Sequence, residues 1–299
     1  MSDIIIHEVG PRDGLQAEKA TVPTDTKLGW IRALVNAGVD IVQVGSFVHP
    51  EKVPQMADTD VLFRAVSAEA HGKTVLSGLV LNEKGLERGL ACGVEMFCLG
   101  VSASETHSTK NTGMGSQEAQ RRIIATAKAA VAAGKRVQVS VQSAFGCGFE
   151  GPISEERVLD IVRAYLEAGL ENISLADTAG HAHPGQVRQL FGRIRALGPD
   201  VRCTCHFHDT YGLGMANIFA ALETGVTSFE TSFAGLGGCP FTKVAAGNVA
   251  TEDLVHALRR RGLRRDIDLE ALVAVGRDVA THFGRELPGR VYKTGSLSY

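Results

Sequence analysis

The sequence lacks any apolar run of the roughly 20 residues that a membrane-spanning helix needs. It also lacks a marked excess of charge of one sign, because 31 Lys and Arg residues stand against 33 Asp and Glu residues, a formal net charge of −2. Nucleic acid and anionic membrane surfaces are therefore poor candidates for the main partner. Residues 1–8 contain neither a basic, apolar leader nor an Arg/Ser-rich presequence, and from this we expect a soluble protein of the cytoplasm.

The chain has few cysteines for its length and no stretch rich in Pro, Gly and Ser that would act as a linker. The cysteines show no small-domain disulfide pattern, and we expect reduced thiols at Cys92, Cys98, Cys147, Cys203, Cys205 and Cys239. With 299 residues, 44% of them hydrophobic, the chain is long enough to bury a core without disulfides. One catalytic domain over residues 1–299 is expected, with a helical extension from about residue 250.

Short runs rich in Val, Ile, Phe or Thr alternate with amphipathic stretches along the whole chain. Eight strands are predicted, at residues 4–9, 41–47, 74–81, 96–101, 136–142, 172–176, 202–208 and 228–233. The spacing of apolar residues predicts helices at 24–37, 117–133, 154–168, 184–197 and 215–224, and two more in the tail, at 250–261 and 269–283.

A strand followed by a helix, eight times over, predicts an α/β protein of the (β/α)8 type, the TIM barrel, with extra C-terminal helices. The alternative is an open, doubly wound sheet of the Rossmann type. Residues 10–14, Gly-Pro-Arg-Asp-Gly, form the first strand-to-helix turn and lack the Gly-x-Gly-x-x-Gly phosphate loop, which favours the barrel. In such barrels, functional side chains lie where strands end and the next loops begin.

The strongest local pattern is His206-Phe207-His208 at the end of the seventh predicted strand. Residues two apart in a strand point to the same face, so both imidazoles would face the barrel mouth. Asp13 follows the first strand and Asn248 follows the eighth, so a carboxylate and an amide oxygen could share one ion with the imidazoles. This donor set suits Mg²⁺ or Mn²⁺, with Zn²⁺ as a further possibility. Two histidines that are neighbours by chance are the alternative interpretation of the motif.

Other polar residues lie at predicted strand ends. Arg12 is either part of a surface salt bridge or a cation that stabilises charge on a substrate oxygen. Asp177, which is followed by Thr178, is a base, a substrate-binding residue or a helix cap, and the sequence leaves these three roles open. Cys239 lies in the glycine-rich segment 235–240, which is either a lid that carries a reactive thiol or a loop with an exposed cysteine.

Five motifs occur in the same order as in one enzyme family. They are residues 8–16 (EVGPRDGLQ), 46–48 with 53–56 (SFV and VPQM), 208–212 (HDTYG), 235–240 (GLGGCP) and 247–254 (GNVATEDL). In these motifs the chain resembles the 3-hydroxy-3-methylglutaryl-CoA lyase family, whose members are metal-dependent TIM-barrel lyases. The resemblance extends from residue 4 to about residue 285. The resemblance implies a carbon–carbon lyase that converts 3-hydroxy-3-methylglutaryl-CoA into acetyl-CoA and acetoacetate by retro-Claisen cleavage.

The resemblance also implies roles for single residues. The ligands of the divalent cation, Mg²⁺ or Mn²⁺, would be Asp13, His206, His208 and Asn248. The catalytic residues would be Arg12, Asp177, His206 and Cys239. The positions that contact the substrate would be Arg12, Gln16, Gln43, Ser46 and Thr178. A small-molecule acyl-CoA substrate and a homodimer are expected on the same ground.

The chain departs from the family pattern at two places. Gln43 stands where the family usually has a catalytic glutamate, and it keeps the shape and hydrogen-bonding reach of glutamate without its charge or basicity. Gln138, Val139 and Ser140 replace residues that in the family include an arginine and a tyrosine. These changes could retune the enzyme toward another 3-hydroxyacyl-CoA. The alternatives are a related metal-dependent barrel aldolase or synthase, and a catalytically silent barrel that binds a metal or CoA.

Overall fold

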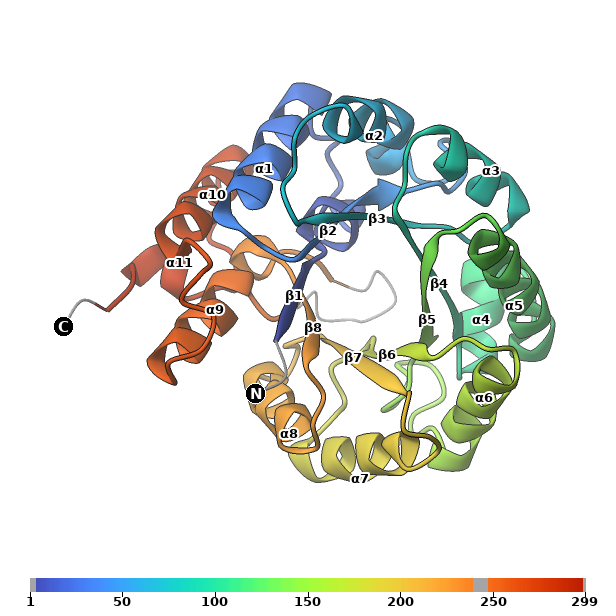
Figure 1. The fold of residues 1–299 in the computed structure, drawn as a ribbon. Helices are drawn as coiled ribbons and strands as arrows, with labels where there is room; N and C mark the ends of the chain where they lie inside the picture. The colour runs from blue at the N-terminus through green and yellow to red at the C-terminus, as the bar shows by residue number, and fades with distance from the viewer. Residues whose placement is uncertain (1–3, 239–246, 298–299) are drawn as a thin grey trace.

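The computed structural model describes residues 4–238 and 247–297. Within them, eight parallel strands form a closed barrel in which each strand pairs with the next and β8 pairs with β1, as Figure 1 shows in a view along the barrel. The strands are β1 Ile5–Glu8, β2 Ile41–Ser46, β3 Val75–Leu79, β4 Met96–Ser102, β5 Arg136–Gln142, β6 Asn172–Asp177, β7 Arg202–Phe207 and β8 Ser228–Thr231. The predicted TIM barrel is confirmed, and each predicted strand end lies within two residues of the observed one.

Helices surround the barrel (Figure 1). They are α1 Thr24–Ala37, α2 Thr59–Ser67, α3 Glu83–Ala91, α4 Glu105–Thr112, α5 Ser116–Ala132, α6 Glu155–Glu167, α7 Pro184–Arg195, α8 Gly214–Glu223, α9 Thr251–Arg260, α10 Leu269–Phe283 and α11 Val291–Thr294. The seven helices predicted with bounds correspond to α1 and to α5 through α10. Helix α4 could not be predicted from periodicity, because none of its residues is apolar. Its start is capped instead by the Ser104 hydroxyl, which accepts a hydrogen bond from the backbone N–H of His107.

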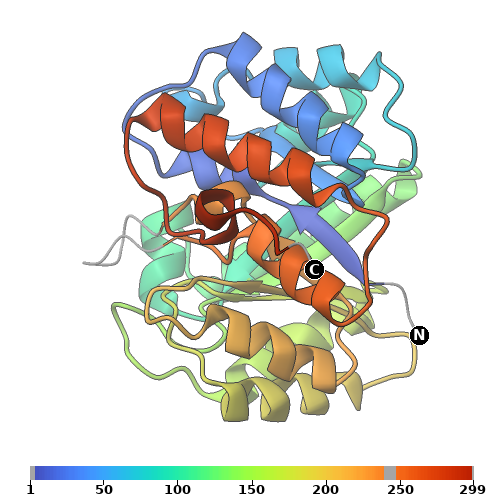
Figure 2. The same ribbon diagram turned by 90° about the vertical axis from the view of Figure 1, so that its left-hand side faces the viewer.

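The helices that follow β8 cover the outside of the barrel between α8 and α1 (Figure 1), and α10 runs beside α1 in the side view of Figure 2. Trp30 of α1 joins the two helices, because its indole N–H donates to Asp278 Oδ2 of α10 at 2.6 Å. The extra C-terminal helices are therefore as expected, and they pack on the barrel. Among the described residues, no helix combines the length and the apolar character needed to cross a bilayer.

The barrel interior is unusually polar. In most TIM barrels the side chains that fill the interior are mainly Val, Ile and Leu. Hydrogen bonds between strands that are not neighbours in the sheet cross this interior: His7 of β1 bonds Ser77 of β3, and Gln138 of β5 bonds Glu230 of β8. The buried polar side chains that face inward are His7, Gln43, Ser77, Gln138, Ser174, Thr204, His206 and Glu230. A barrel filled in this way needs a connected hydrogen-bond network to offset the loss of hydration.

The barrel closes at the seam between β1 and β8, and Glu8 holds the seam from the side of the helices. One oxygen of its buried carboxylate accepts hydrogen bonds from the N–H groups of Gly10 (2.7 Å) and Phe233 (3.0 Å). The other oxygen accepts from the Thr251 hydroxyl, at the start of α9, at 2.6 Å. Gly10 has to be glycine here, because a Cβ would lie 2.6 Å from the Glu8 carboxylate and 2.8 Å from the Phe233 ring.

We predict that Glu8→Gln abolishes the fall in stability that ionisation of Glu8 causes, because the amide does not ionise and its N–H₂ can donate to the Thr251 hydroxyl, which accepts as well as donates. Burial raises the pKa of Glu8 from 4.5 to about 7 despite these hydrogen bonds. The folded state therefore holds a proton that the unfolded state releases, and wild-type stability falls as pH rises from about 4.5 to about 7. Urea unfolding over this pH range measures the effect.

The exposed carboxylate Glu87 on α3 provides a control, since Glu87→Gln changes the same chemical group at the surface. The stability of the Glu87→Gln variant should follow the wild-type pH profile, whereas Glu8→Gln should lack the fall assigned to Glu8. Identical pH profiles for Glu8→Gln and the wild type would contradict this assignment.

Candidate active site at the carboxyl ends of the strands

Arg12 and Asp13 lie on a single π-helical turn, Gly10–Gly14, directly after β1. The N–H groups of residues 12, 13 and 14 all donate to the carbonyl of Val9, at 3.1, 2.7 and 3.4 Å. Pro11 suits the second position of this turn because its missing N–H would have no partner there. Such π turns are rare and occur mostly at functional sites, and this one turns two neighbouring charged side chains toward the mouth of the barrel.

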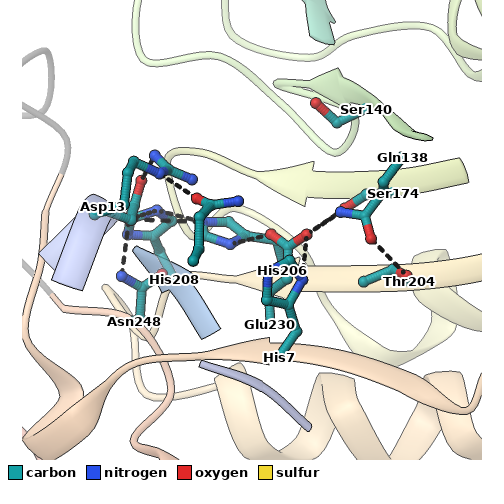
Figure 3. Close-up of polar contacts among 12 residues, drawn as sticks. His7, Asp13, Gln138, Ser140, Ser174, Thr204, His206, His208, Glu230 and Asn248 are labelled. Carbon is teal, nitrogen blue, oxygen red and sulfur yellow. Dashed lines mark hydrogen bonds and ion pairs between the residues drawn. The ribbon is translucent and has the colours of Figure 1, made fainter. Parts of the chain in front are cut away.

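Asp13, His206 and His208 come together as the sequence predicts. Their nearest ligand atoms all lie within 4.8 Å of one another (Figure 3). The two Nε2 atoms are 3.2 Å apart, and Asp13 Oδ2 lies 3.8 Å from His206 Nε2 and 4.0 Å from His208 Nε2. Ligands about 2.0–2.2 Å from one ion lie roughly 3–3.5 Å apart, so a small inward movement of Asp13 would complete a metal site. These three residues could hold a divalent cation.

Asn248 lies beside this cluster, as predicted. Its side-chain N–H₂ donates to Asp13 Oδ2 at 2.9 Å and to the carbonyl of Leu236 at 3.1 Å (Figure 3). Its buried side-chain oxygen has no hydrogen-bond partner among the described residues. Gly237, at φ +125°, permits this arrangement, since a Cβ there would lie 2.5 Å from the Asn248 nitrogen. An unpaired amide oxygen next to a carboxylate and two imidazoles fits the oxygen and nitrogen ligands that divalent cations prefer.

The guanidinium of Arg12 is held from two sides. Its Nε donates to Gln43 Oε1 on β2, and its Nη1 donates to Asp13 Oδ1. The salt bridge that the sequence left open is therefore formed with Asp13 itself, at the barrel mouth rather than on an outer surface. A guanidinium fixed next to a candidate metal ligand can stabilise negative charge on a nearby oxygen without having to reorganise.

The charged groups of the cluster shift one another's pKa values. Burial raises the pKa of Asp13, but the charges of Arg12, His206 and His208 outweigh burial and hold that pKa well below its usual range. Burial lowers the pKa of His206, whereas its hydrogen bond to Glu230 and the charge of Asp13 raise it, and the net pKa lies above the ordinary 6.5. Protonation of His206 is thus favoured in the metal-free protein, and because only a neutral imidazole coordinates, metal binding competes with that proton.

Asp177, at the end of β6, holds the loop that follows it. Its two carboxylate oxygens accept from the N–H groups of His181 (2.8 Å) and Ala182 (3.0 Å). It is not the cap of α7, because His183 occupies that position. Burial raises the pKa of Asp177 to about 6 although the backbone N–H groups lower it. A carboxylate that changes protonation state near neutral pH is suited to proton transfer.

The residues predicted to contact substrate differ in how they are engaged. Ser46 Oγ and Gln16 Oε1 are buried atoms with no hydrogen-bond partner among the described residues. Thr178 Oγ1 already accepts from the N–H of Ser143 at 2.9 Å and holds the left-handed turn there, at φ 55°. Cys239 lies outside the described residues.

His7 and Glu230, which lie below the candidate metal ligands, were not predicted as site residues from the sequence. Glu230 Oε2 is 2.9 Å from His206 Nδ1, and Glu230 Oε1 is 3.7 Å from His7 Nδ1 (Figure 3). A signal was present, since an acid and an imidazole in the middle of predicted buried strands are rare unless they are paired. Strand alternation shows that such a side chain points inward, but it does not identify which residue on another strand is its polar partner.

Together, the fold and the site define a TIM-barrel enzyme whose chemistry lies at the carboxyl ends of the strands. Residues 3–279 match the HMGL-like family model. The chain is 36% identical to the hydroxymethylglutaryl-CoA lyase of Bacillus subtilis over 287 residues, which is 96% of this chain and 95% of that protein. It is 37% identical to the (R)-citramalyl-CoA lyase of Chloroflexus aurantiacus, over 99% of this chain and 96% of that protein.

Among solved structures, an HMG-CoA lyase from Acinetobacter baumannii in complex with coenzyme A and 3-methylmalate superposes with a TM-score of 0.93 at 36% identity. The match covers 99% of this chain and 96% of the other. The chain thus belongs to the HMGL-like family, and it is a carbon–carbon lyase of the hydroxymethylglutaryl-CoA lyase type.

We predict that the metal-free protein binds Mn²⁺ and that binding weakens in acid. Because the pKa of His206 lies above 6.5 and only neutral imidazole coordinates, the apparent dissociation constant should rise about tenfold for each pH unit below that pKa. Calorimetric titration over a pH series measures this. Asp13→Asn and His208→Asn should each weaken binding, while His71→Asn, in the loop before β3 at the other end of the barrel, serves as a control. A pH-independent affinity would contradict coordination by His206.

Proposed function

We propose that this enzyme cleaves a 3-hydroxyacyl-CoA in a reaction that depends on a divalent cation, Mg²⁺ or Mn²⁺, and that 3-hydroxy-3-methylglutaryl-CoA is the first candidate substrate. The observation that carries the proposal is the cluster of Asp13, His206 and His208 at the barrel mouth, with Arg12 hydrogen-bonded to Asp13. A cation beside a fixed guanidinium is the combination that retro-Claisen cleavage needs, because negative charge moves from one substrate oxygen to another during the reaction.

Asp13, His206, His208 and Asn248 would hold the cation, which when bound lowers the pKa of the substrate 3-hydroxyl and stabilises negative charge. Asp177, whose pKa is raised to about 6, would take the hydroxyl proton. The C2–C3 bond then breaks, and its electron pair passes to the enolate of acetyl-CoA while a keto product forms. Arg12 would stabilise the developing charge, and Cys239 would protonate the carbanion. His206 is the weaker candidate for this step, because the cation would occupy Nε2 while Nδ1 faces Glu230.

Gln43 gives a reason to assign proton abstraction to Asp177. A carboxamide has no basicity in the relevant range, so Gln43 cannot accept the hydroxyl proton as a glutamate could. What Gln43 does instead is accept the hydrogen bond from Arg12 Nε. We propose that it orients the guanidinium and contacts the substrate, together with Gln16, Ser46 and Thr178.

The second candidate substrate is a related 3-hydroxyacyl-CoA with a different acyl group. Relatives with two different substrates in their names, hydroxymethylglutaryl-CoA and (R)-citramalyl-CoA, are about equally similar to this chain, at 36% and 37% identity. Ser140, half-buried on β5 where the family has a larger residue nearby, would leave more room at the mouth. The homodimer and the cytoplasmic location stay predictions.

A panel of 3-hydroxyacyl-CoA esters tests the proposal directly. After chelation and re-addition of Mg²⁺ or Mn²⁺, we expect release of a keto product and acetyl-CoA from at least one ester, and none in excess chelator. Asp13→Asn should lower kcat/KM by about 100-fold or more, since it removes a ligand and several kcal/mol of charge stabilisation with it. His71→Asn should not change it. No release from any ester would leave the silent barrel as the better description.

The role of Gln43 leads to a separate prediction. Gln43→Ala should lower kcat about tenfold or more, because a hydrogen bond to a charged group contributes about 1.5–3 kcal/mol and about 1.4 kcal/mol corresponds to a factor of ten. Gln43→Glu keeps an oxygen acceptor for Arg12 and should retain the orientation of the guanidinium. Steady-state kinetics on the best ester of the panel separate the two variants. An unchanged kcat in Gln43→Ala would show that Arg12 does not depend on this contact.

A further inference from the structure

A buried carboxylate, Glu230, lies directly behind one of the candidate metal ligands. The sheet register makes the juxtaposition unavoidable, because Glu230 of β8 is paired with His7 of β1 on one side and with His206 of β7 on the other. Paired residues on neighbouring strands point to the same face, so all three side chains enter the barrel at one level (Figure 3). Glu230 Oε2 lies 2.9 Å from His206 Nδ1.

The other oxygen of Glu230 is fixed by hydrogen-bond donors from across the barrel. Gln138 Nε2 donates to Oε1, and the Ser174 hydroxyl lies 3.4 Å from the same atom (Figure 3). The Gln138 amide turns its N–H₂ to Glu230 because a carboxylate can only accept, and Gln138 Oε1 then faces the Thr204 hydroxyl at 3.4 Å. Glu230 Oε1 is therefore occupied, and Oε2 is directed to the imidazole.

This arrangement selects one tautomer of His206. A carboxylate oxygen 2.9 Å from Nδ1 favours a proton on that nitrogen, because a carboxylate can only accept and two lone pairs would repel at this distance. Nε2 then has a free lone pair when the imidazole is neutral, and Nε2 is the atom that faces Asp13 Oδ2 and His208 Nε2. The opposite tautomer would place a proton where a metal ion has to bind.

We propose that Glu230 is a positioning residue that holds His206 in the tautomer and ring orientation required for metal binding, and that Gln138 holds Glu230 in place. The inference rests on the proposed function, since it assigns a role within the metal site. Partners of this kind behind metal-binding histidines typically change metal affinity 10–100-fold when they are lost.

The discriminating variant is Glu230→Gln. As long as the Thr204 hydroxyl donates to Gln138 Oε1, Gln138 Nε2 still needs an acceptor at residue 230, so the amide oxygen stays on that side and the N–H₂ turns to His206 Nδ1. Nδ1 must then accept, and the proton moves to Nε2. We expect Mn²⁺ affinity to fall 10–100-fold in calorimetric titration, with little change in melting temperature.

The matched control exchanges the two side chains, in the double variant Gln138→Glu with Glu230→Gln. The new carboxylate at position 138 accepts from the amide N–H₂ at position 230, which turns the amide oxygen back to His206 Nδ1. The charge of the barrel interior is unchanged, and Mn²⁺ affinity should recover to within about tenfold of the wild type. A wild-type affinity in the single variant, or no recovery in a folded double variant, would overturn the proposal.

Nitrogen NMR of the metal-free wild type gives a test that needs no variant to fold. At alkaline pH, where His206 is neutral, its proton should reside on Nδ1; a proton on Nε2 would refute the role of Glu230. The two proposals also fail separately. Absence of Mn²⁺ binding by the wild type refutes the metal site but leaves the tautomer measurement decisive for Glu230. Equal Mn²⁺ binding by the wild type and the Glu230→Gln variant refutes only the positioning role.

Discussion

The candidate site exists because the barrel closes between β1 and β8. Asp13 follows the first strand and the two histidines end the seventh, so only closure brings the carboxylate and the imidazoles to one point. The Glu8 carboxylate holds this seam, since it accepts N–H groups from both strand ends and the hydroxyl that opens α9. Alternation along β1 then places His7 inward and Glu8 outward, so that one strand serves the catalytic interior and the structural seam at the same time.

Much of this arrangement could be predicted from the sequence. The eight strands and the barrel follow from short β-rich runs separated by amphipathic helices, and the meeting of Asp13, His206 and His208 follows from strand ends and period-two alternation. These predictions succeeded because they depend only on backbone periodicity and topology. The helix at α4 escaped prediction for the same reason, since its start is fixed by the Ser104 side chain rather than by an apolar pattern.

The contacts inside the barrel could not be predicted, because they depend on register and side-chain rotamers across non-neighbouring strands. Nothing in the sequence near Glu230 indicates that Gln138, 92 residues earlier, donates to it. The π-helical turn that points Arg12 and Asp13 at the mouth was likewise expected only as a strand-to-helix turn. Only the closed barrel, with all eight registers fixed, defines which polar groups meet at one level and which of them must donate.

The two departures from the family pattern acquire a common meaning in this network. Gln43 stands in place of an acid, and the stretch around Gln138 lacks the arginine that the family has there, so the site loses one charge of each sign. Both amides are fully engaged, Gln43 as the acceptor for Arg12 and Gln138 as the donor to Glu230. An amide can orient a charged neighbour as well as an ion can, but it neither gives nor takes a proton. The chain has therefore kept the geometry that orients Arg12 and His206, and proton transfer is left to groups that ionise, such as Asp177, whose pKa is raised to about 6.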